Sequence, residues 1–516
     1  MVMNHDIIVI GGGHNGLVAA ATLQKAGRRV LLLERREKLG GIAAALEIHP
    51  GYRLPGLLHE TSAFRRAVID ELSLHRSGLA LLEREPPVLA AAREGKGTLL
   101  PRGKAFASAA VDGVSEDDAR GYADLMSFLS RAGEALRPVF SAAPPDFDRP
   151  SAGEIFSLLR TGIGIRRLGK KDLPELLRAA PMPVADLVRE RVEDERLQAA
   201  IAVPALRGSF LGPYSPWSAF PLFYQAAGHE HGGVQGGGAA VVDALTRAAL
   251  ALGVTVRTGA RVERIEIRRG EATGVRLDSG ESFGARRVVA TCDPRTVFLD
   301  LVDPVEVPPS LTGEAERYRG RGTTAMVHLA LSGALEIAGR PGTPFERARI
   351  CDSLEEAERA FDACKGRRLP AAPLLEVWVP TVSDPTLAPP GHHVVSIIVH
   401  FVPHDLEGGW RDEKRDELRK IVLDRLSLYA PGVLDRIVGA SCLTPRDLED
   451  VYGLRNGHPD HGEHAVDQLL LFRPFASCGH YATPIRGLYL GGSGSHPGGG
   501  ITGAPGLLAA RAVLAG

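Results

Sequence analysis

Three glycines near the start of the sequence have the spacing of a backbone site for phosphate. Gly11, Gly13 and Gly16 follow the GxGxxG pattern, and Glu34 lies 18 residues after the last of them. The first glycine permits a tight turn, the second lets a pyrophosphate approach the backbone, and the third lets a helix pack closely on a strand. An acid about 20 residues further on accepts hydrogen bonds from ribose hydroxyls. These residues predict a dinucleotide site that disfavours a 2′-phosphate.

The elements that such a site requires occur in the right order. A short apolar run at 6–10 precedes the glycines, and a helical stretch at 17–26 ends at Gly27. A second apolar run at 30–33 leads directly into Glu34. Strand, turn, helix and strand would therefore point a helix N-terminus, which favours anions, at the phosphates.

The motif continues beyond Glu34, the acidic residue expected to bind the ribose. Arg35 and Arg36 follow it, and Gly40 and Gly41 form a further glycine pair. This pair indicates another close approach of backbone to the ligand, and the extended pattern is more typical of FAD than of NAD. No second strand–GxGxxG–helix unit occurs in the sequence, so one dinucleotide site is expected.

A second glycine-rich segment lies near the other end of the sequence. The run 488–490 predicts a buried strand, 491–500 holds six glycines, and 503–514 predicts a helix with Pro505 in its first turn. Glycines allow backbone to lie against a flat ring, and the positive helix end would stabilise a reduced flavin. A glycine-rich surface loop is the alternative interpretation.

Both glycine-rich segments resemble a known family. Residues 10–21, Ile-Gly-Gly-Gly-His-Asn-Gly-Leu-Val-Ala-Ala-Ala, and residues 487–506 are similar to the two ends of the phytoene-dehydrogenase-related FAD flavoproteins, which include bacterial carotenoid desaturases and ketolases. The His-Asn pair at 14–15 points to the ketolase-like branch that includes pyridine nucleotide-disulphide oxidoreductase domain-containing proteins. The blocks at 467–468 and 472–474 resemble the same branch. The resemblance implies non-covalent FAD.

One departure from this family is visible. Leu507 and Leu508 stand where the family usually has Arg-Asn, so any polar contact of that pair is missing here.

The motifs and the resemblance together assign the cofactor-binding residues. The resemblance further implies that backbone at Val262 pairs with the adenine and that the turn at 291–293 passes near the nucleotide. The expected set is Gly11, Gly13, His14, Asn15, Gly16, Glu34, Arg35, Arg36, Gly40, Gly41, Val262, Thr291, Gly492, Ser493, Gly500, Ile501 and Thr502.

These elements predict an α/β protein whose FAD domain is glutathione-reductase-like, of Rossmann type. After a helical stretch at 239–252, runs at 254–257, 262–267 and 274–278 predict a three-stranded β-meander that returns through 287–293. We expect a discontinuous FAD domain of residues 1–75, 228–300 and 441–516.

Residues 76–227 and 301–440 are then expected to form a discontinuous α+β substrate lobe. Strand-like runs at 323–331, 374–380 and 393–402 predict a sheet over the flavin, and 412–429 has helical spacing.

Catalysis by a flavin requires little from side chains. Because the flavin accepts a hydride, the protein mainly has to hold the donor carbon in place. The candidate acid–base residues are His496, His231 and His59. His496 comes first because it lies in the segment expected to face the flavin, although a histidine that orders this loop would look the same. His229 and Glu230 beside His231 lack a third ligand, so no metal site is expected.

Three functions fit these observations. The resemblance favours a desaturase, ketolase or isomerase of a lipophilic, polyene- or carotenoid-like substrate, which predicts an elongated apolar tunnel. An oxidase or dehydrogenase of a smaller amine, alcohol or peptidyl substrate would instead have a short pocket with placed polar groups. The third function is a non-catalytic flavin-binding scaffold.

The composition limits which binding partners and electron acceptors are expected. The formal net charge of the 516 residues is −1, which gives no global attraction to nucleic acid, and the five cysteines have no CxxC spacing. Without a cysteine relay or second dinucleotide site, oxygen or a quinone is the expected electron acceptor. We expect no signal peptide and a cytoplasmic enzyme. The segment 155–171, which mixes apolar and basic residues, is a candidate for peripheral membrane contact, and the sequence leaves the oligomeric state open.

Overall fold

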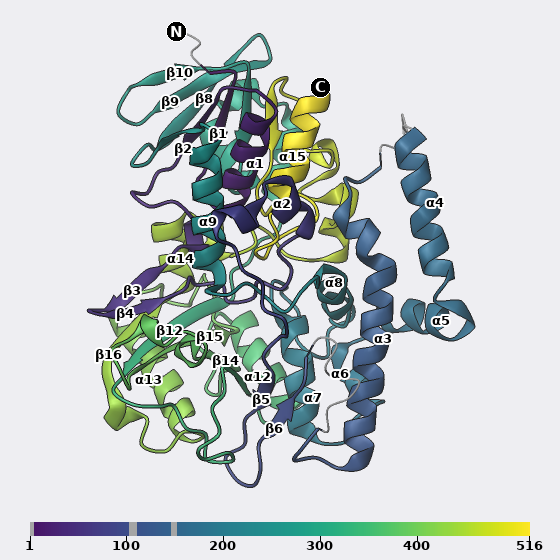
Figure 1. Cartoon of the computed structure of the whole chain (residues 1–516), viewed down its shortest axis with the longest axis vertical. Coiled ribbons are helices and arrows are strands. Elements are labelled where there is room, and N and C mark those ends of the chain that lie inside the picture. Colours follow the sequence, from purple (N-terminus) through teal and green to yellow (C-terminus); the bar gives the residue numbers. More distant parts are fainter. Residues whose placement is uncertain (1–4, 103–110, 146–151) are drawn as a thin grey trace.

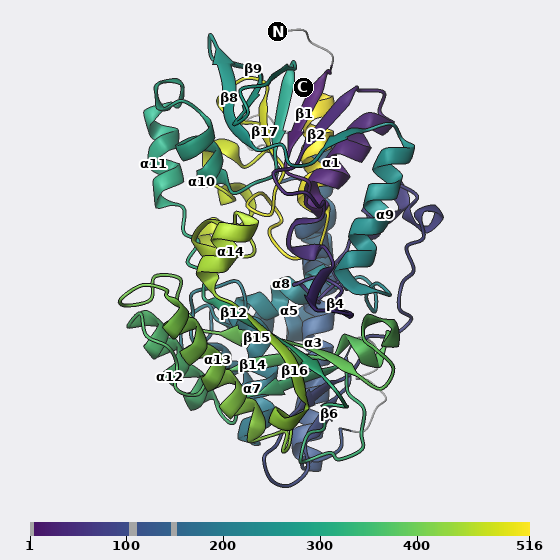
Figure 2. The same cartoon turned by 90° about the vertical axis from the view of Figure 1, so that its left-hand side faces the viewer.

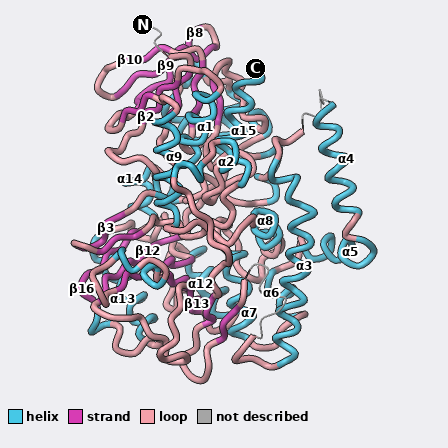
Figure 3. The backbone as a smooth tube through the Cα atoms, viewed as in Figure 1, coloured by secondary structure: helices cyan, strands magenta, loops and turns pink. Residues whose placement is uncertain are grey.

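The computed structural model describes residues 5–102, 111–145 and 152–516, and for 152–157 the backbone alone. Figure 1 shows an upper part, which contains the first and the last described elements of the chain, and a lower part built on a large sheet. Figure 2 shows the same two parts from the side. Figure 3 shows them coloured by secondary structure, with helices along one flank.

A five-stranded parallel sheet forms the centre of the upper part. Its strands in spatial order are β17 (Leu488–Leu490), β11 (Arg287–Ala290), β1 (Ile7–Ile10), β2 (Val30–Leu33) and β7 (Thr255–Arg257). Every residue of β1 and β2 is buried, as expected for parallel strands covered on both faces. The predicted strands at 6–10, 30–33 and 488–490 and the Rossmann-type fold are confirmed.

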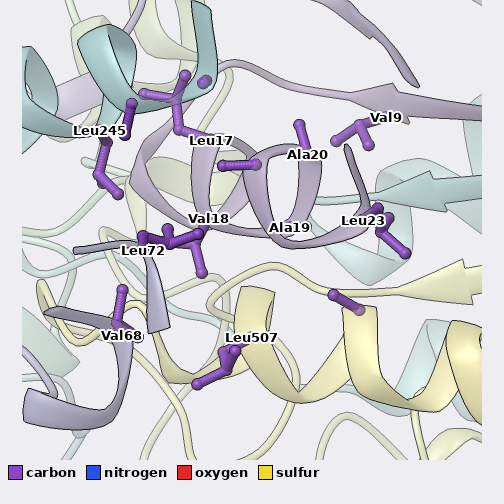
Figure 4. Packing of buried hydrophobic residues seen from close by; sticks show 14 of the residues in the cluster. Val9, Leu17, Val18, Ala19, Ala20, Leu23, Val68, Leu72, Leu245 and Leu507 are labelled. Carbon is purple, nitrogen blue, oxygen red and sulfur yellow. The ribbon is translucent and has the colours of Figure 1, made fainter. Parts of the chain in front are cut away.

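Helix α1 (His14–Lys25) is buried from His14 to Leu23 and packs between α9 (Gly237–Ala251) and α15 (Ala504–Ala515). Figure 4 shows Leu17, Val18 and Leu23 of α1 in this core, with Leu245 of α9 and Leu507 of α15 nearby. Leu507 and Leu508 are both buried in it. The departure from the family's Arg-Asn pair therefore contributes apolar packing.

The β-meander is only partly as predicted. A three-stranded antiparallel sheet is formed by β8 (Val262–Arg268), β9 (Glu271–Leu277) and β10 (Ser282–Gly284). The assignment of 254–257 to it was wrong, because β7 pairs in parallel with β2 in the main sheet. β7 follows the crossover helix α9, and a strand that follows such a helix returns parallel to its neighbour.

A seven-stranded mixed sheet forms the lower part, and it confirms the strands expected at 323–331, 374–380 and 393–402. Its strands in spatial order are β16 (Ile437–Leu443), β12 (Thr324–Leu331), β15 (His393–His400), β14 (Leu375–Trp378), β13 (Arg347–Ile350), β5 (Val88–Ala90) and β6 (Thr98–Leu100). A small hairpin of β3 (Leu46–His49) and β4 (Tyr52–Leu54) contacts β12, β15 and β16. The domain boundary expected at 440/441 falls inside β16, all of which belongs to this sheet.

The two faces of the seven-stranded sheet differ in chemistry. Val327, Val377 and Ile397 belong to a core that also contains residues of α13 (Asp412–Ser427), the helix expected at 412–429. Because side chains alternate along a strand, the next residues, His328, Trp378 and Ile398, point to the other face.

The remaining helices flank these sheets. They are α2 (Arg66–Glu71), α3 (Glu116–Ser141), α4 (Ala152–Arg166), α5 (Gly169–Ala179), α6 (Val184–Arg189), α7 (Glu195–Ala202), α8 (Phe220–Gly228), α10 (Pro294–Thr296), α11 (Pro309–Arg317), α12 (Leu354–Lys365) and α14 (Pro445–Tyr452). The segment 155–171 forms most of α4 and the start of α5, and Figure 1 shows α4 at the edge of the molecule beside α3. Among the described residues, no helix is long and apolar enough to cross a bilayer.

Candidate active site

The glycine turn between β1 and α1 leaves an open cradle at the helix N-terminus. Gly11 has a φ of +101°, which favours glycine, and Gly13 precedes α1 as its N-cap. A Cβ added to Gly13 would have no heavy atom within 4 Å, whereas one added to Gly16 would overlap the carbonyl oxygen of Gly11. Gly16 thus permits close helix–strand packing, and Gly13 leaves space where a pyrophosphate can meet backbone N–H groups.

Glu34 lies at the end of β2 and holds the turn from the other side. Its Oε2 accepts a hydrogen bond from Gly12 N at 2.6 Å, and its Oε1 accepts one from Arg36 N at 2.9 Å. The carboxylate is buried. It is fixed by backbone beside the cradle, as a residue that accepts ribose hydroxyls has to be.

The segment after Glu34 closes one side of the cradle. Gly40 N donates to Gly12 O at 2.8 Å, which brings the second glycine pair beside the first. Arg36 Nη1 donates to Gly41 O at 3.2 Å, and Arg35 Nη2 donates to Val451 O of α14 at 2.9 Å. The two arginines therefore hold this loop in place and bind to backbone.

Thr291 and Val262 lie on neighbouring elements. Thr291 follows β11, and its Oγ1 donates to Ile10 O at 2.9 Å, so it supports the first glycine of the turn. Val262 begins β8 and is buried beside Ile10 and Leu33 in one apolar core.

The carboxyl-terminal glycine segment reaches the same place. Asn15 Nδ2 donates to Ser493 Oγ at 3.3 Å, which joins the start of α1 to the loop after β17. Gly492 packs against the backbone of Thr291. Gly500, Ile501 and Thr502 follow in the loop that leads into α15, where Thr502 Oγ1 accepts a hydrogen bond from Ala504 N.

A buried polar cluster that the sequence did not reveal fixes this loop. Asp460 Oδ1 accepts a hydrogen bond from Gly500 N at 2.8 Å, and His464 Nε2 accepts one from Gly499 N at 3.2 Å. Burial lowers the pKa of His464 to about 3, so the ring is neutral at pH 7 and can serve as an acceptor. Arg473 is fully buried and donates to Ser493 O at 2.9 Å. The high proportion of His, Asp and Glu residues at 458–464 is the sequence feature that could have indicated this cluster.

A large cavity that is partly open to solvent begins at this loop and extends into the lower part. Its volume is about 1030 Å³, at the upper end of the range for small-molecule sites. Gly499, Gly500, Ile501 and Thr502 line one region of it. Its apolar wall includes Leu58, Leu81, Leu100, Met126, Leu129, Ile201, Leu222 and Ile398.

The three predicted catalytic histidines lie in different environments. His59 is on the cavity wall, where its Nε2 pairs with Ser396 Oγ at 2.7 Å, and burial lowers its pKa to about 3. His231 also reaches the wall, but its Nε2 pairs with Phe64 O at 2.8 Å and its Nδ1 accepts from Gly233 N at 3.1 Å, a structural arrangement.

His496 is fully buried, with its ring stacked near Phe140, and the residues that line the cavity do not include it. Of the three, His59 has the position that suits contact with a substrate. Among the described residues, no group of three or more His, Cys, Asp or Glu has the arrangement of a metal site.

The residues present fit FAD. The open cradle at Gly13, the fixed carboxylate of Glu34 and the two glycine loops supply backbone and acidic contacts for a dinucleotide. Two buried atoms at the start of α1, His14 Nε2 and Asn15 Oδ1, have no hydrogen-bond partner among the described residues. A ligand with donor groups can satisfy them.

Comparison with known proteins agrees with this site. Residues 118–514 match the model of the family described as flavin containing amine oxidoreductase, and residues 9–65 match the NAD(P)-binding Rossmann-like domain.

Similar proteins cover nearly the whole chain. A pyridine nucleotide-disulfide oxidoreductase domain-containing protein 2 from Mus musculus is 31% identical, over 99% of this chain and 93% of its own. A lycopene-forming phytoene desaturase from Pseudescherichia vulneris is 26% identical, over 98% of each chain. A solved structure of a triple mutant of putrescine oxidase has a TM-score of 0.60 and 16% identity, over 99% of each chain, which shows the likeness of the fold.

Proposed function

Because this chain belongs to the flavin containing amine oxidoreductase family and is an FAD-dependent oxidoreductase, we propose that it removes a hydride from a lipophilic, polyene-like substrate. The observation that carries this proposal is the cavity of about 1030 Å³, which joins the loop at 499–502 to a wall of leucine, isoleucine and methionine side chains. Such a cavity has room for an extended molecule, and its apolar wall favours a hydrocarbon body.

The residues of this chain would bind the cofactor and hold the donor carbon. Gly13 and the N-terminus of α1 would take the pyrophosphate, and Glu34 the ribose hydroxyls. When bound, FAD supplies a two-electron acceptor for the hydride. Asp460 and His464 would keep the backbone of Gly499 and Gly500 in position beside the substrate, because they accept the N–H groups of these residues.

Four of the carboxylates that line the cavity already have partners. An ammonium group would require a free carboxylate in the cavity. Glu60 and Glu85 are paired with Arg102, Glu230 is paired with Arg65, and Asp460 accepts the N–H of Gly500. The exposed residues Glu83 and Glu134 also line the cavity and form no ion pair within the described part of the chain. An oxidase of a smaller amine, alcohol or peptidyl substrate is the second candidate, because the putrescine oxidase structure has the same fold.

The experiment is anaerobic mixing of the FAD-loaded protein with a panel of polyenes and a panel of small amines and alcohols, with the absorbance of the oxidised flavin as readout. Bleaching by a polyene is expected. Bleaching by small polar donors alone would overturn the proposal in favour of the second candidate.

We also propose that a cytoplasmic form of the enzyme contacts a membrane surface through α4. Leu158, Leu159 and Ile163 are exposed there, although large apolar side chains are usually buried. Gly164 lies against Ala135 of α3, and the neighbouring exposed Glu134 lines the cavity. A lipophilic substrate could then pass from the bilayer to the cavity.

Flotation with vesicles that contain phosphatidylglycerol tests this contact. The variant Leu159→Glu/Ile163→Glu should lose binding, and Leu250→Glu, at an exposed position of α9, should retain it. Equal flotation of both variants would contradict the proposal.

We propose oxygen or a quinone as the electron acceptor, because the sequence holds a single dinucleotide motif. Reoxidation of the photoreduced holoenzyme by air-saturated buffer or by a soluble quinone, and not by NAD(P)⁺, is the expected result.

A further inference from the structure

An arginine cluster lies on the cavity face of the seven-stranded sheet. In the register of β13 and β14, Arg347 is opposite Trp378 and Arg349 is opposite Glu376. Arg102, which follows β6, and Arg207 join them from other elements. The four arginines surround a small pocket together with Glu60, Glu376 and Trp378.

The carboxylates in this cluster already form ion pairs with basic residues of the chain. Glu376 accepts two hydrogen bonds from Arg207 Nη2, at 2.7 and 2.8 Å, and pairs with His400 Nε2 at 2.9 Å. Burial alone would raise the pKa of Glu376, but Arg207, His400 and Arg349 hold it well below the usual value.

The two other carboxylates share two arginines. Glu60 lies 3.2 Å from Arg102 and 3.1 Å from Arg347, and Glu85 lies 2.8 Å from Arg102 and 3.3 Å from Arg347. Four guanidinium groups therefore share three carboxylates within 4 Å in the described part of the chain, so one guanidinium has no carboxylate of its own.

The guanidinium with the weakest carboxylate contact is that of Arg349. Arg349 is 9% exposed, and its Nη1 donates to Ala200 O at 2.6 Å. Its closest carboxylate contact is Nε to Glu376 Oε2 at 3.7 Å, and this Nε has no hydrogen-bond partner in the described part of the chain. A buried cation that is so weakly paired is costly unless another anion joins it.

The cluster has donors that a ligand can reach. The side chains of Arg102 and Arg207 are 25% and 28% exposed although they lie inside the molecule, so their exposed surface faces the cavity. The small pocket has a volume of about 20 Å³, and Arg102, Arg207 and Arg349 belong both to it and to the large cavity. A space of this size is larger than the ~10–15 Å³ that one water requires.

We propose that the substrate carries a carboxylate, which binds to Arg102, Arg207 and Arg349, while its apolar chain extends along Leu222 and Ile201 toward the loop at 499–502. This inference rests on the proposed function and adds a polar end to its lipophilic substrate. A substrate carboxylate would supply the anion that Arg349 lacks, and guanidinium groups match the planar geometry of a carboxylate.

The test compares two probes of equal chain length, dodecanoate and dodecanol, by isothermal titration calorimetry with the FAD-loaded protein. Dodecanoate should bind at least about tenfold more tightly, because hydrogen bonds to charged groups are stronger than neutral ones. Equal affinities of the two probes for the wild type would overturn the inference.

Variants locate the carboxylate site. Arg349→Gln should abolish the preference for dodecanoate, since it removes the least paired guanidinium, and Arg102→Gln provides a second test if the first variant folds poorly. Arg84→Gln, at an exposed position of the same cavity wall, is the matched control and should keep the preference. A preference that survives in both Arg349→Gln and Arg102→Gln would contradict the proposed site.

The two proposals fail in different ways. Arginine-dependent binding of dodecanoate without bleaching of the flavin by any polyene would support this inference and overturn the proposed function. Bleaching by neutral polyenes without any preference for dodecanoate would support the proposed function and overturn this inference.

Discussion

The contrast between Gly13 and Gly16 allows protein stability and cofactor affinity to be separated. We predict that Gly13→Ala leaves the stability of the apoprotein almost unchanged and strongly weakens FAD binding. The backbone of Gly13 has φ −68° and ψ 173°, which alanine adopts without strain, and the added Cβ would meet no atom within 4 Å. Alanine lowers the entropy of the unfolded chain, which raises the free energy of unfolding by about 0.5–1 kcal/mol. It is also a poorer N-cap residue, which lowers this free energy by about the same amount.

The same Cβ would occupy the space through which the pyrophosphate reaches backbone N–H groups. Loss of one or two hydrogen bonds to a charged ligand costs about 3 kcal/mol, which corresponds to roughly a hundredfold increase in Kd. Gly16→Ala should behave in the opposite way, because its Cβ would overlap the carbonyl oxygen of Gly11. This overlap should lower the free energy of unfolding of the apoprotein by about 2 kcal/mol.

Two measurements check this pair of predictions. Urea denaturation of the apoproteins gives the free energy of unfolding, and titration of FAD with protein, followed by flavin fluorescence, gives the Kd. The assignment of the cradle is wrong if the Kd of Gly13→Ala for FAD lies within about threefold of the wild-type value. It is also wrong if Gly13→Ala lowers the free energy of unfolding as much as Gly16→Ala does.

Three further predictions concern charged and titrating groups. Glu34→Gln should raise the Kd for FAD by about tenfold or more, measured by the same titration, because the amide offers one acceptor oxygen where the carboxylate offers two. Arg473→Met should lower the free energy of unfolding by about 3–5 kcal/mol, measured by urea denaturation, since it leaves buried carbonyl oxygens such as Ser493 O without a donor; an effect below about 1 kcal/mol would contradict this. Burial lowers the pKa of His14 to about 4 and of His464 to about 3, from 6.5. Below pH 6.5 the unfolded state therefore binds protons that the folded state does not, and stability should fall by about 1.4 kcal/mol per pH unit for each such histidine until the folded pKa is reached; urea midpoints that do not change between pH 7.5 and 5 would refute this.

The features predicted correctly from the sequence are local ones. The glycine turn and the strands on either side of it occupy adjacent positions in the chain, so their spacing alone determines how they meet. The same holds for β17 and α15, which flank the second glycine segment. Fold class and cofactor follow from these two segments.

The substrate region depends on contacts between distant parts of the chain. Arg102, Arg207, Arg349 and Glu376 meet only because the seven-stranded sheet sets their register, and an isolated arginine in a strand does not show which face it occupies. His496 could not be placed for the same reason. Its loop lies where the motif predicted, but which side of a loop a ring faces is decided by the packing around it.

The order of strands in the upper sheet has a consequence for biosynthesis. β17 lies at one edge of that sheet, next to β11, and α15 packs on α1, although about 490 residues separate these two helices along the chain. While the chain emerges from the ribosome, the apolar surface of α1 that packs on α15 remains exposed until residues 488–515 have been synthesised. This part of the molecule therefore folds late, and a nascent chain that stalls before residue 488 would expose the core shown in Figure 4 to chaperones and proteases.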